Sequence, residues 1–128
     1  SPLHLLCEQG PLDLIQRFIE SDANINIQTS DGRTPLYLAA QNLRFECCQL
    51  LLERGADPNT ADNDGITPLY FLCKDGQEDL AKKFLYYGAD VNSEGCIHVA
   101  LEFYHAGVVD LLRYAGCNVN KVFILVFN

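Results

Sequence analysis

The chain has 128 residues, of which 48% are apolar and 20% charged, and its formal net charge is -8. This length and composition allow one compact domain or a short array of repeats, and exclude a disordered tail or a charged coiled coil. The acidity argues against binding to nucleic acid or anionic lipid, which needs clustered Lys and Arg. No apolar stretch long enough for a membrane span and no signal-peptide pattern occurs, so we expect a soluble protein.

A period of 33 residues organises the chain. Ser1-Pro2-Leu3-His4-Leu5 returns as Thr34-Pro35-Leu36-Tyr37-Leu38 and as Thr67-Pro68-Leu69-Tyr70-Phe71, so the prolines are spaced by 33. A second phrase keeps the register in Gly55-Ala56-Asp57-Pro58-Asn59 and Gly88-Ala89-Asp90-Val91-Asn92. Self-similarity at a fixed spacing is the signature of a repeat architecture.

Each repeat is predicted to contain two helices. Thr34 and Thr67 are suited to cap a helix, and the Pro that follows each of them fits the first helical position, where a missing N–H costs nothing. A short helix should begin there, and a second amphipathic helix is predicted near residues 44–54. Gly55 and Gly88 then allow the positive φ that ends a helix. The Asn-rich and Asp-Gly segments that follow favour turns and a short hairpin.

These phrases resemble the TPLHLA and GADVN motifs of the ankyrin repeat family, which stand here as TPLYLA at residues 34–39 and GADVN at residues 88–92. The resemblance covers nearly the whole chain. It implies an all-α solenoid of about four helix-turn-helix units with short β-hairpin fingers. The units are expected at residues 1–33, 34–66, 67–94 and 95–128 of a single ankyrin repeat domain, which we interpret as a segment of a larger protein.

The fourth unit departs from this spacing. Cys96 takes the place of the proline only 28 residues after Pro68, and Ser93-Glu94-Gly95 replaces the usual finger. We predict that this finger is absent or reduced to a tight turn. The chain then continues into an apolar run that resembles no part of a unit, formed by Val122, Phe123, Ile124, Leu125, Val126 and Phe127. We interpret the run as a cap over the fourth unit or, alternatively, as a surface for self-association.

The cysteines and histidines show no catalytic or metal-binding pattern. None of the six cysteines belongs to a CxxC pair, and most fall on core positions of the repeat, as expected for thiols in a reducing compartment. The pairs His4 with Cys7 and Glu102 with His105 lack further ligands at suitable spacing, so no metal is expected. In the ankyrin repeat family, the histidine of the TPLHLA motif usually supports the neighbouring finger by hydrogen bonding. The resemblance therefore implies a structural role for His4 and His98. No phosphate loop or serine-nucleophile motif occurs, and we expect neither enzymatic activity nor a cofactor.

The resemblance implies that a partner binds the concave surface of finger tips and first helices. The expected contact residues are Gln28, Ser30, Asp31, Arg33, Gln41 and Asn42 in the second unit and Ala61, Asn63, Asp64, Ile66, Lys74 and Asp75 in the third. Glu8 and Gln9 extend the row at one end, and Glu94, Glu102 and Phe103 at the other. The charged members are six acidic and two basic residues, so half of the net charge falls there. An acidic groove should attract a basic or amide-rich segment of another protein. The resemblance also makes Asn59 and Asn92 candidates for asparaginyl hydroxylation.

We therefore expect a non-catalytic protein–protein interaction module, a scaffold or adaptor, in the cytoplasm or nucleus. Neither a nucleic acid nor a membrane is an expected partner. One alternative is the substrate-recognition domain of a ubiquitin ligase or another enzyme complex. A second is a repeat domain that binds a small ligand or nucleotide, although the groove contains few basic and aromatic residues.

Overall fold

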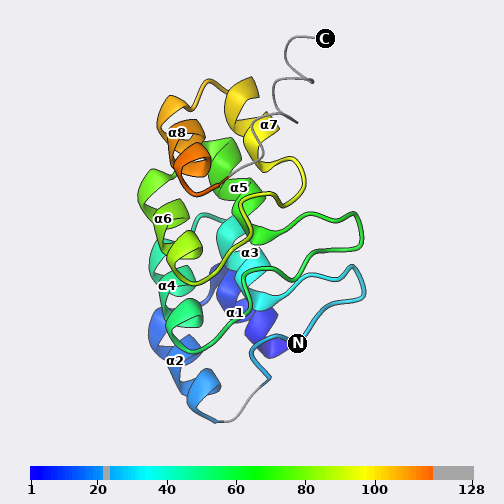
Figure 1. The fold of residues 1–128 in the computed structure, drawn as a ribbon. Helices are drawn as coiled ribbons and strands as arrows, with labels where there is room; N and C mark the ends of the chain where they lie inside the picture. Colours follow the sequence, from blue (N-terminus) through cyan, green and yellow to red (C-terminus); the bar gives the residue numbers. More distant parts are fainter. Residues whose placement is uncertain (22–23, 117–128) are drawn as a thin grey trace.

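The computed structural model describes residues 1–21 and 24–116, which fold into eight helices in four antiparallel pairs. The pairs are α1 (Pro2–Gln9) with α2 (Leu12–Glu20), α3 (Pro35–Gln41) with α4 (Phe45–Glu53), α5 (Pro68–Asp75) with α6 (Glu78–Tyr86), and α7 (Cys96–Glu102) with α8 (Ala106–Tyr114). Figure 1 shows them stacked in two layers, an inner layer of α1, α3, α5 and α7 and an outer layer of α2, α4, α6 and α8. The apolar run at 122–127 lies outside the described residues.

The inner helices begin largely as the sequence predicts. A proline occupies the first turn of α1, α3 and α5. At α3 the Thr34 hydroxyl oxygen accepts the Tyr37 N–H at 3.1 Å, which confirms the predicted cap. The same prediction is wrong for Thr67, which makes no cap hydrogen bond. Its hydroxyl donates instead to Ser93 Oγ at 3.2 Å, because the shortened third loop brings that oxygen within reach.

The turns after the outer helices use glycine as predicted. Gly55 and Gly88 follow α4 and α6 with φ of +90° and +95°, a region that is open to glycine without steric cost. The turns within two of the pairs place Leu43 and Tyr104 in the left-handed region, at φ of +55° and +61°. A bulky side chain there costs about 1–2 kcal/mol, which the packing of the two helices has to offset.

The core lies between the two layers and between successive pairs. All five cysteines within the described residues are buried, namely Cys7, Cys47, Cys48, Cys73 and Cys96. This confirms the prediction that they occupy core positions. Together with Ala39 and Ala40, they provide small side chains that let neighbouring helices approach closely.

The loops that precede α3 and α5 project from the stack, whereas the loop before α7 is short (Figure 1). Each long loop closes a turn with two backbone hydrogen bonds. The Thr29 N–H donates to the Arg33 carbonyl and the Gly32 N–H to the Thr29 carbonyl, both at 2.9 Å, and the Asp62 N–H donates to the Ile66 carbonyl at 2.9 Å and the Gly65 N–H to the Asp62 carbonyl at 3.0 Å. These bonds close turns and do not form a ladder, and residues 1–21 and 24–116 contain no β-strand, so the expected β-hairpins are not seen. The third loop passes through consecutive turns into Cys96, which confirms its predicted reduction.

Asparagine side chains join successive loops. Asn26 Oδ1 accepts the Asp57 N–H at 2.9 Å, and Asn59 Oδ1 accepts the Asp90 N–H at 2.7 Å. Asn59 also donates through Nδ2 to the Gly88 carbonyl at 2.9 Å. Its own N–H bonds to Asp57 Oδ1, which is the predicted turn contact. The repeated asparagine therefore lies in a turn that the Asp57 carboxylate closes, and its side chain fixes the position of the next unit.

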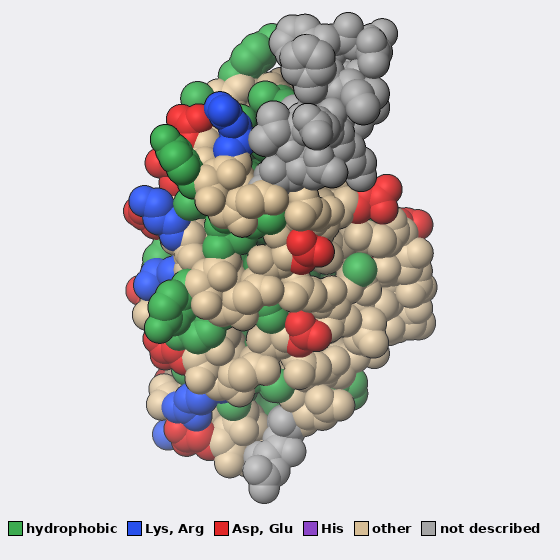
Figure 2. Space-filling model, viewed as in Figure 1, with side chains coloured by type: hydrophobic (Ala, Val, Ile, Leu, Met, Phe, Trp, Pro, Cys, Tyr) green, Lys and Arg blue, Asp and Glu red, His purple; other side chains and the backbone are tan. Residues whose placement is uncertain are grey.

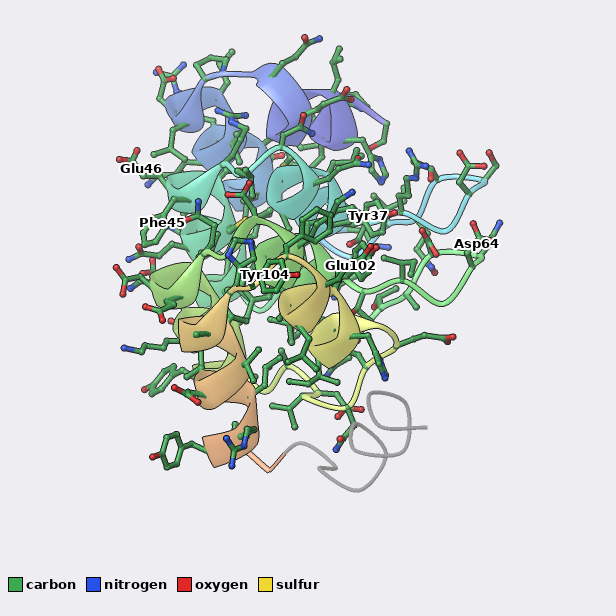
Figure 3. All side chains as sticks on the ribbon, turned by 90° about the horizontal axis from the view of Figure 1, so that it is seen from above. Tyr37, Phe45, Glu46, Asp64, Glu102 and Tyr104 are labelled. Atoms are coloured by element: carbon green, nitrogen blue, oxygen red, sulfur yellow. The ribbon has the colours of Figure 1, made fainter. Side chains whose placement is uncertain are left out.

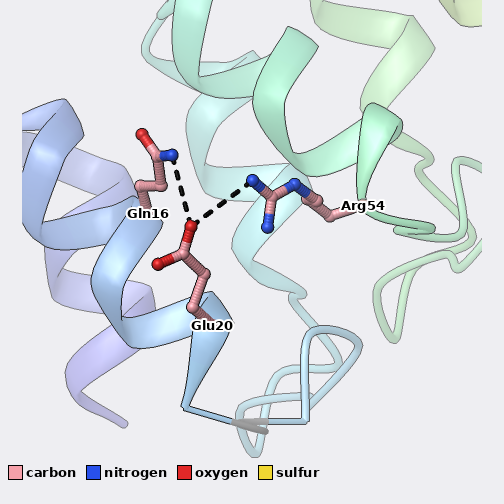
Figure 4. A network of polar contacts seen from close by, with 3 residues as sticks. All are labelled: Gln16, Glu20 and Arg54. Atoms are coloured by element: carbon pink, nitrogen blue, oxygen red, sulfur yellow. Dashed lines mark hydrogen bonds and ion pairs between the residues drawn. The ribbon is translucent and has the colours of Figure 1, made fainter.

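Two arginines on either side of α4 make different contacts with the first helix pair. Arg44 Nη1 donates to the carbonyls of Leu6 and Cys7 at 2.7 and 3.2 Å, and its Nη2 donates to Gly10, so the guanidinium caps the end of α1. Arg54 Nη2 forms an ion pair with Glu20 Oε1 of α2 at 3.6 Å, and the same Glu20 oxygen accepts a hydrogen bond from Gln16 (Figure 4).

Replacing these two arginines separates the two kinds of contact. Arg44→Met keeps the aliphatic stem but removes three hydrogen bonds to helix-end carbonyls, and should lower the free energy of unfolding by about 1.5–3 kcal/mol. Arg54→Met removes one exposed ion pair and should cost less than about 1 kcal/mol. Urea unfolding measures both. Equal effects would show that the α1 cap does not contribute.

Candidate functional site

We define the loop face as the loops at residues 24–33 and 57–66, the short third loop and the C-terminal ends of α1, α3, α5 and α7. All of the sequence-predicted contact residues lie on it. Ser30, Asp31, Asn63 and Asp64 are exposed near the ends of the long loops. In Figure 3 Asp64 stands at the outer end of its loop, on the side opposite Phe45 and Glu46 of the outer layer.

Some of the predicted contact residues hold the loops in place. Asn63 donates its backbone N–H to the Asp31 carbonyl and its side-chain amide to the Ser30 carbonyl, both at 2.9 Å. Gln28 donates to the Gly32 carbonyl of its own loop at 3.0 Å. The two long loops therefore support each other, and their carboxylates stand on a fixed frame.

The inner helices anchor the loops at their bases. His4 Nε2 donates to the Arg33 carbonyl at 2.9 Å, and its Nδ1 therefore accepts from Ser1 Oγ, also at 2.9 Å. This confirms the role that the resemblance implied for His4. At the equivalent position of the next unit, the Tyr37 hydroxyl donates to Asp62 Oδ2 at 2.6 Å.

Asp62 organises the second long loop, a role that was not predicted from the sequence. Its Oδ1 accepts the N–H groups of Asp64 and Ile66 at 2.9 and 3.0 Å. The sequence feature that could have identified Asp62 is its repeat position, which is equivalent to that of Thr29. The Thr29 hydroxyl accepts the Arg33 N–H at 3.1 Å. A short side chain with an oxygen acceptor is what both loops have there.

The hydrogen bond between Tyr37 and Asp62 contributes to a shift in the pKa of both side chains. Burial and the hydrogen bond to the Asp62 carboxylate raise the pKa of Tyr37 from 10.0 to about 12. Burial acts to raise the pKa of Asp62, but the hydrogen bonds from Tyr37, Ile66 and Asp64 outweigh it, so the net pKa is lowered. Folding therefore favours a neutral phenol beside an ionised carboxylate.

The ends of the inner helices form the other side of the loop face. Gln41 and Asn42 lie at the end of α3, Lys74 and Asp75 at the end of α5, and Glu102 and Phe103 at the end of α7. Stacking of α3, α5 and α7 places them in successive units. Asn42 is engaged in capping, because its amide donates to the Leu38 carbonyl at 2.8 Å. Lys74 Nζ lies 6.0 Å from the centre of the Phe103 ring.

Charge is distributed unevenly between the two sides of the molecule. The two ion pairs seen within residues 1–21 and 24–116 both lie on the outer layer, Arg54 at the end of α4 with Glu20 of α2, and Arg113 with Asp110 of α8. Figure 2 shows the Lys and Arg side chains of the viewed face gathered over the outer layer. On the loop face, Arg33 is half-buried, with its guanidinium 5.5 Å from the Tyr37 ring centre.

The two asparagines considered for hydroxylation are both exposed. Asn59 uses its side-chain oxygen and nitrogen in the contacts to Asp90 and Gly88. A hydroxylase would therefore have to reach a side chain that is held by the next unit. Hydroxylation of Asn59 or Asn92 stays a prediction.

A pH titration tests the bond between Tyr37 and Asp62. Tyr37→Phe should lower the free energy of unfolding by about 1 kcal/mol at neutral pH. Because the folded-state pKa of Tyr37 is raised, this stability is complete below pH 10 and is lost as pH rises through about 12. For Asp62, whose pKa is lowered, the contribution is present above its ordinary value and is lost on acidification.

Tyr70→Phe is the matched control, because Tyr70 holds the same repeat position. Urea unfolding across this pH range, with ultraviolet titration of the tyrosines, gives the comparison. If Tyr37→Phe and Tyr70→Phe have the same effect at every pH, the anchor has no energetic role.

Within residues 1–21 and 24–116 no three His, Cys, Asp or Glu residues are arranged to hold a metal ion. Over the same residues, no helix has the length and apolar character needed to cross a bilayer.

No curated protein matches the chain. A family model described as "Ankyrin repeats (3 copies)" matches residues 1–62 and 54–122. The chain thus belongs to the ankyrin repeat family, whose members are generally protein–protein interaction modules and typically non-catalytic.

Proposed function

We propose that this chain is a scaffold or adaptor that binds a basic or amide-rich segment of another protein in a groove along the loop face. Family membership supports a protein partner in general terms. The basic or amide-rich character of the partner segment is inferred from the residues of the loop face. Its backbone is held by the side-chain bonds of Asn63, Gln28 and Asp62, so a partner meets a pre-organised surface.

The observation that carries the proposal is a set of carboxylates without cationic partners. The six acidic side chains among the predicted contact residues are exposed, and none is in an ion pair with any residue of 1–21 or 24–116. They are Glu8, Asp31, Asp64, Asp75, Glu94 and Glu102. Unpaired charges of one sign on neighbouring elements add their fields, which steers a cationic segment toward the surface.

Lys74 and Phe103 give this surface a second kind of contact. The Lys74 ammonium lies near the Phe103 ring, and Phe103, just after the end of α7, is 46% exposed. An exposed aromatic ring beside carboxylates suits an arginine or lysine of the partner, because the ring face and the carboxylates both attract a cation.

Charge reversal at the ends of the long loops tests this binding mode. The Asp31→Lys, Asp64→Lys double variant should slow association with the partner about tenfold at low salt and reduce its salt dependence. The partner is first captured from cell extract with the wild-type chain, and association rates are then measured at several salt concentrations.

Glu46→Lys, Asp79→Lys is the matched control, with the same charge change on exposed residues of the outer helices. It should bind like the wild type. If both double variants slow association equally, only the net charge matters. If neither does, the interface lies away from the long loops.

A further inference from the structure

The outer layer carries a groove between its first two helices. One hollow of about 320 Å³ is lined by Leu12 at the start of α2 and by residues 44–47 at the start of α4. A second hollow of about 250 Å³ is lined by Leu12 and by Glu46, Gln49, Leu50 and Glu53 of α4. Because Leu12 and Glu46 line both, the two hollows adjoin, and we call them together the outer groove.

One side of α4 forms the wall of the outer groove. The four α4 residues of the second hollow are spaced i, i+3, i+4 and i+7, which aligns them along one side of a helix. Leu12 and Leu50 are partly exposed, and Phe45 is 37% exposed. Apolar surface therefore reaches solvent beside two carboxylates. Figure 3 shows Phe45 and Glu46 on the side opposite Asp64, so this surface is separate from the loop face.

Neither carboxylate of the outer groove is in an ion pair with any residue of 1–21 or 24–116. Glu53 accepts a hydrogen bond from the neutral Gln49 amide at 3.0 Å, which leaves its charge in place. Arg44 donates to the carbonyls that end α1, and Arg54 pairs with Glu20. The outer groove therefore combines apolar surface with two negative charges that these arginines do not neutralise.

The next interface of the outer layer shows which group this groove lacks. Lys83 of α6 stands at the repeat position of Leu50, as Phe45 does at that of Leu12. Lys83 Nζ lies 5.8 Å from the centre of the Phe45 ring, within the range of a cation–π contact. Between α4 and α6 the chain therefore places a cation of its own over the apolar side chain. Between α2 and α4 the same position holds an uncharged leucine.

We propose that the outer groove docks a short segment of another protein, which places an apolar side chain in each hollow and a lysine or arginine between them, at Glu46. Glu46 lines both hollows, so one cation beside it lies next to both apolar side chains. From Glu46 to Glu53 the helix rises about 10 Å, which an extended segment covers with about three residues. The groove is thus suited to an apolar–basic–apolar sequence.

Charge favours a basic segment over a second copy of this chain. The chain has a net charge of -8, so a second copy is repelled as it approaches a groove that is itself negative. Anionic lipid is disfavoured for the same reason. A cationic segment is attracted to the groove, and the apolar side chains beside its cation then bury the exposed surface of Leu12 and Leu50.

Blocked peptides test the chemistry of the outer groove on the whole chain. The three probes carry Leu-Arg-Leu, Leu-Glu-Leu or Ala-Arg-Ala between glycines, and the amide signals of the protein are followed by NMR. Leu-Arg-Leu should shift the signals of α2 and α4 and bind at least about tenfold more tightly than Leu-Glu-Leu. It should bind at least about fivefold more tightly than Ala-Arg-Ala, because alanines leave the hollows unfilled. Equal affinities, no shifts, or shifts confined to the loop face would overturn the proposal.

Two variants separate the shape of the groove from its charge. Leu50→Lys gives α4 the lysine that α6 has, and should weaken Leu-Arg-Leu binding at least about tenfold, because it places a cation beside Glu46. Leu14→Lys is the matched control, with the same change at an exposed leucine of α2 that lines neither hollow. It should bind within about twofold of the wild type, and equal weakening by both variants would contradict docking in the groove.

The double variant Glu46→Gln, Glu53→Gln keeps the size of both side chains and removes their charge. It should abolish the preference for Leu-Arg-Leu over Leu-Glu-Leu, and a preference that survives would overturn the proposal. Sedimentation tests the other occupant, because a dimer that Leu50→Lys abolishes would mean that a second copy fills the groove and would also overturn it. In the association measurements described above, a partner of the outer groove would be slowed by Glu46→Lys, Asp79→Lys and not by the loop-face variant, so failure at either surface is seen separately.

Discussion

Each helix pair of this protein buries its apolar face against the next pair, and the remaining structure depends on that burial. The inner-helix position of Cys7, Ala40 and Cys73 is closed three times in succession by a following helix. In a repeat stack of this kind, stability is a sum of such nearest-neighbour interfaces, because no unit has enough apolar surface of its own. A change at one interface therefore acts on its two pairs first and on the distant pairs only through them.

Along the loops, polar side chains also form their contacts between one unit and the next. Asn26 and Asn59 each hold the turn of the next unit, and His4 and Tyr37 each hold the next loop. The bonds of Asn26, Asn59 and His4 satisfy backbone groups that a loop without β-pairing would otherwise leave to water. The carboxylates of the loop face take no part in the ion pairs of the described residues, so they can serve a partner without weakening the stack.

The repeat spacing predicted most of the fold, because helix starts and core positions are local features of the sequence. Pro35 at the start of α3, the Thr34 cap and the buried cysteines follow from residue type and position within the unit. The contacts of Arg44 and Asp62 could not be predicted from residue type and repeat position. Arg44 reaches Leu6 over 38 positions of the chain and Tyr37 reaches Asp62 over 25, and neither pairing has a local signature. Thr67 differed from Thr34 for a similar reason, since its partner Ser93 belongs to a loop of altered length.

The short third loop makes the loop face asymmetric along the stack. Over the second and third pairs, a segment lying on this face meets both a projecting loop and the end of an inner helix. At the fourth pair the loop that precedes α7 is short, and the end of that helix offers Glu102 and the half-exposed Phe103. Because one end of the surface is dominated by loop carboxylates and the other by a ring and a helix end, the two directions of a bound peptide would have different energies. Under the proposed function, a surface of this shape would select the orientation of the bound segment as well as its charge.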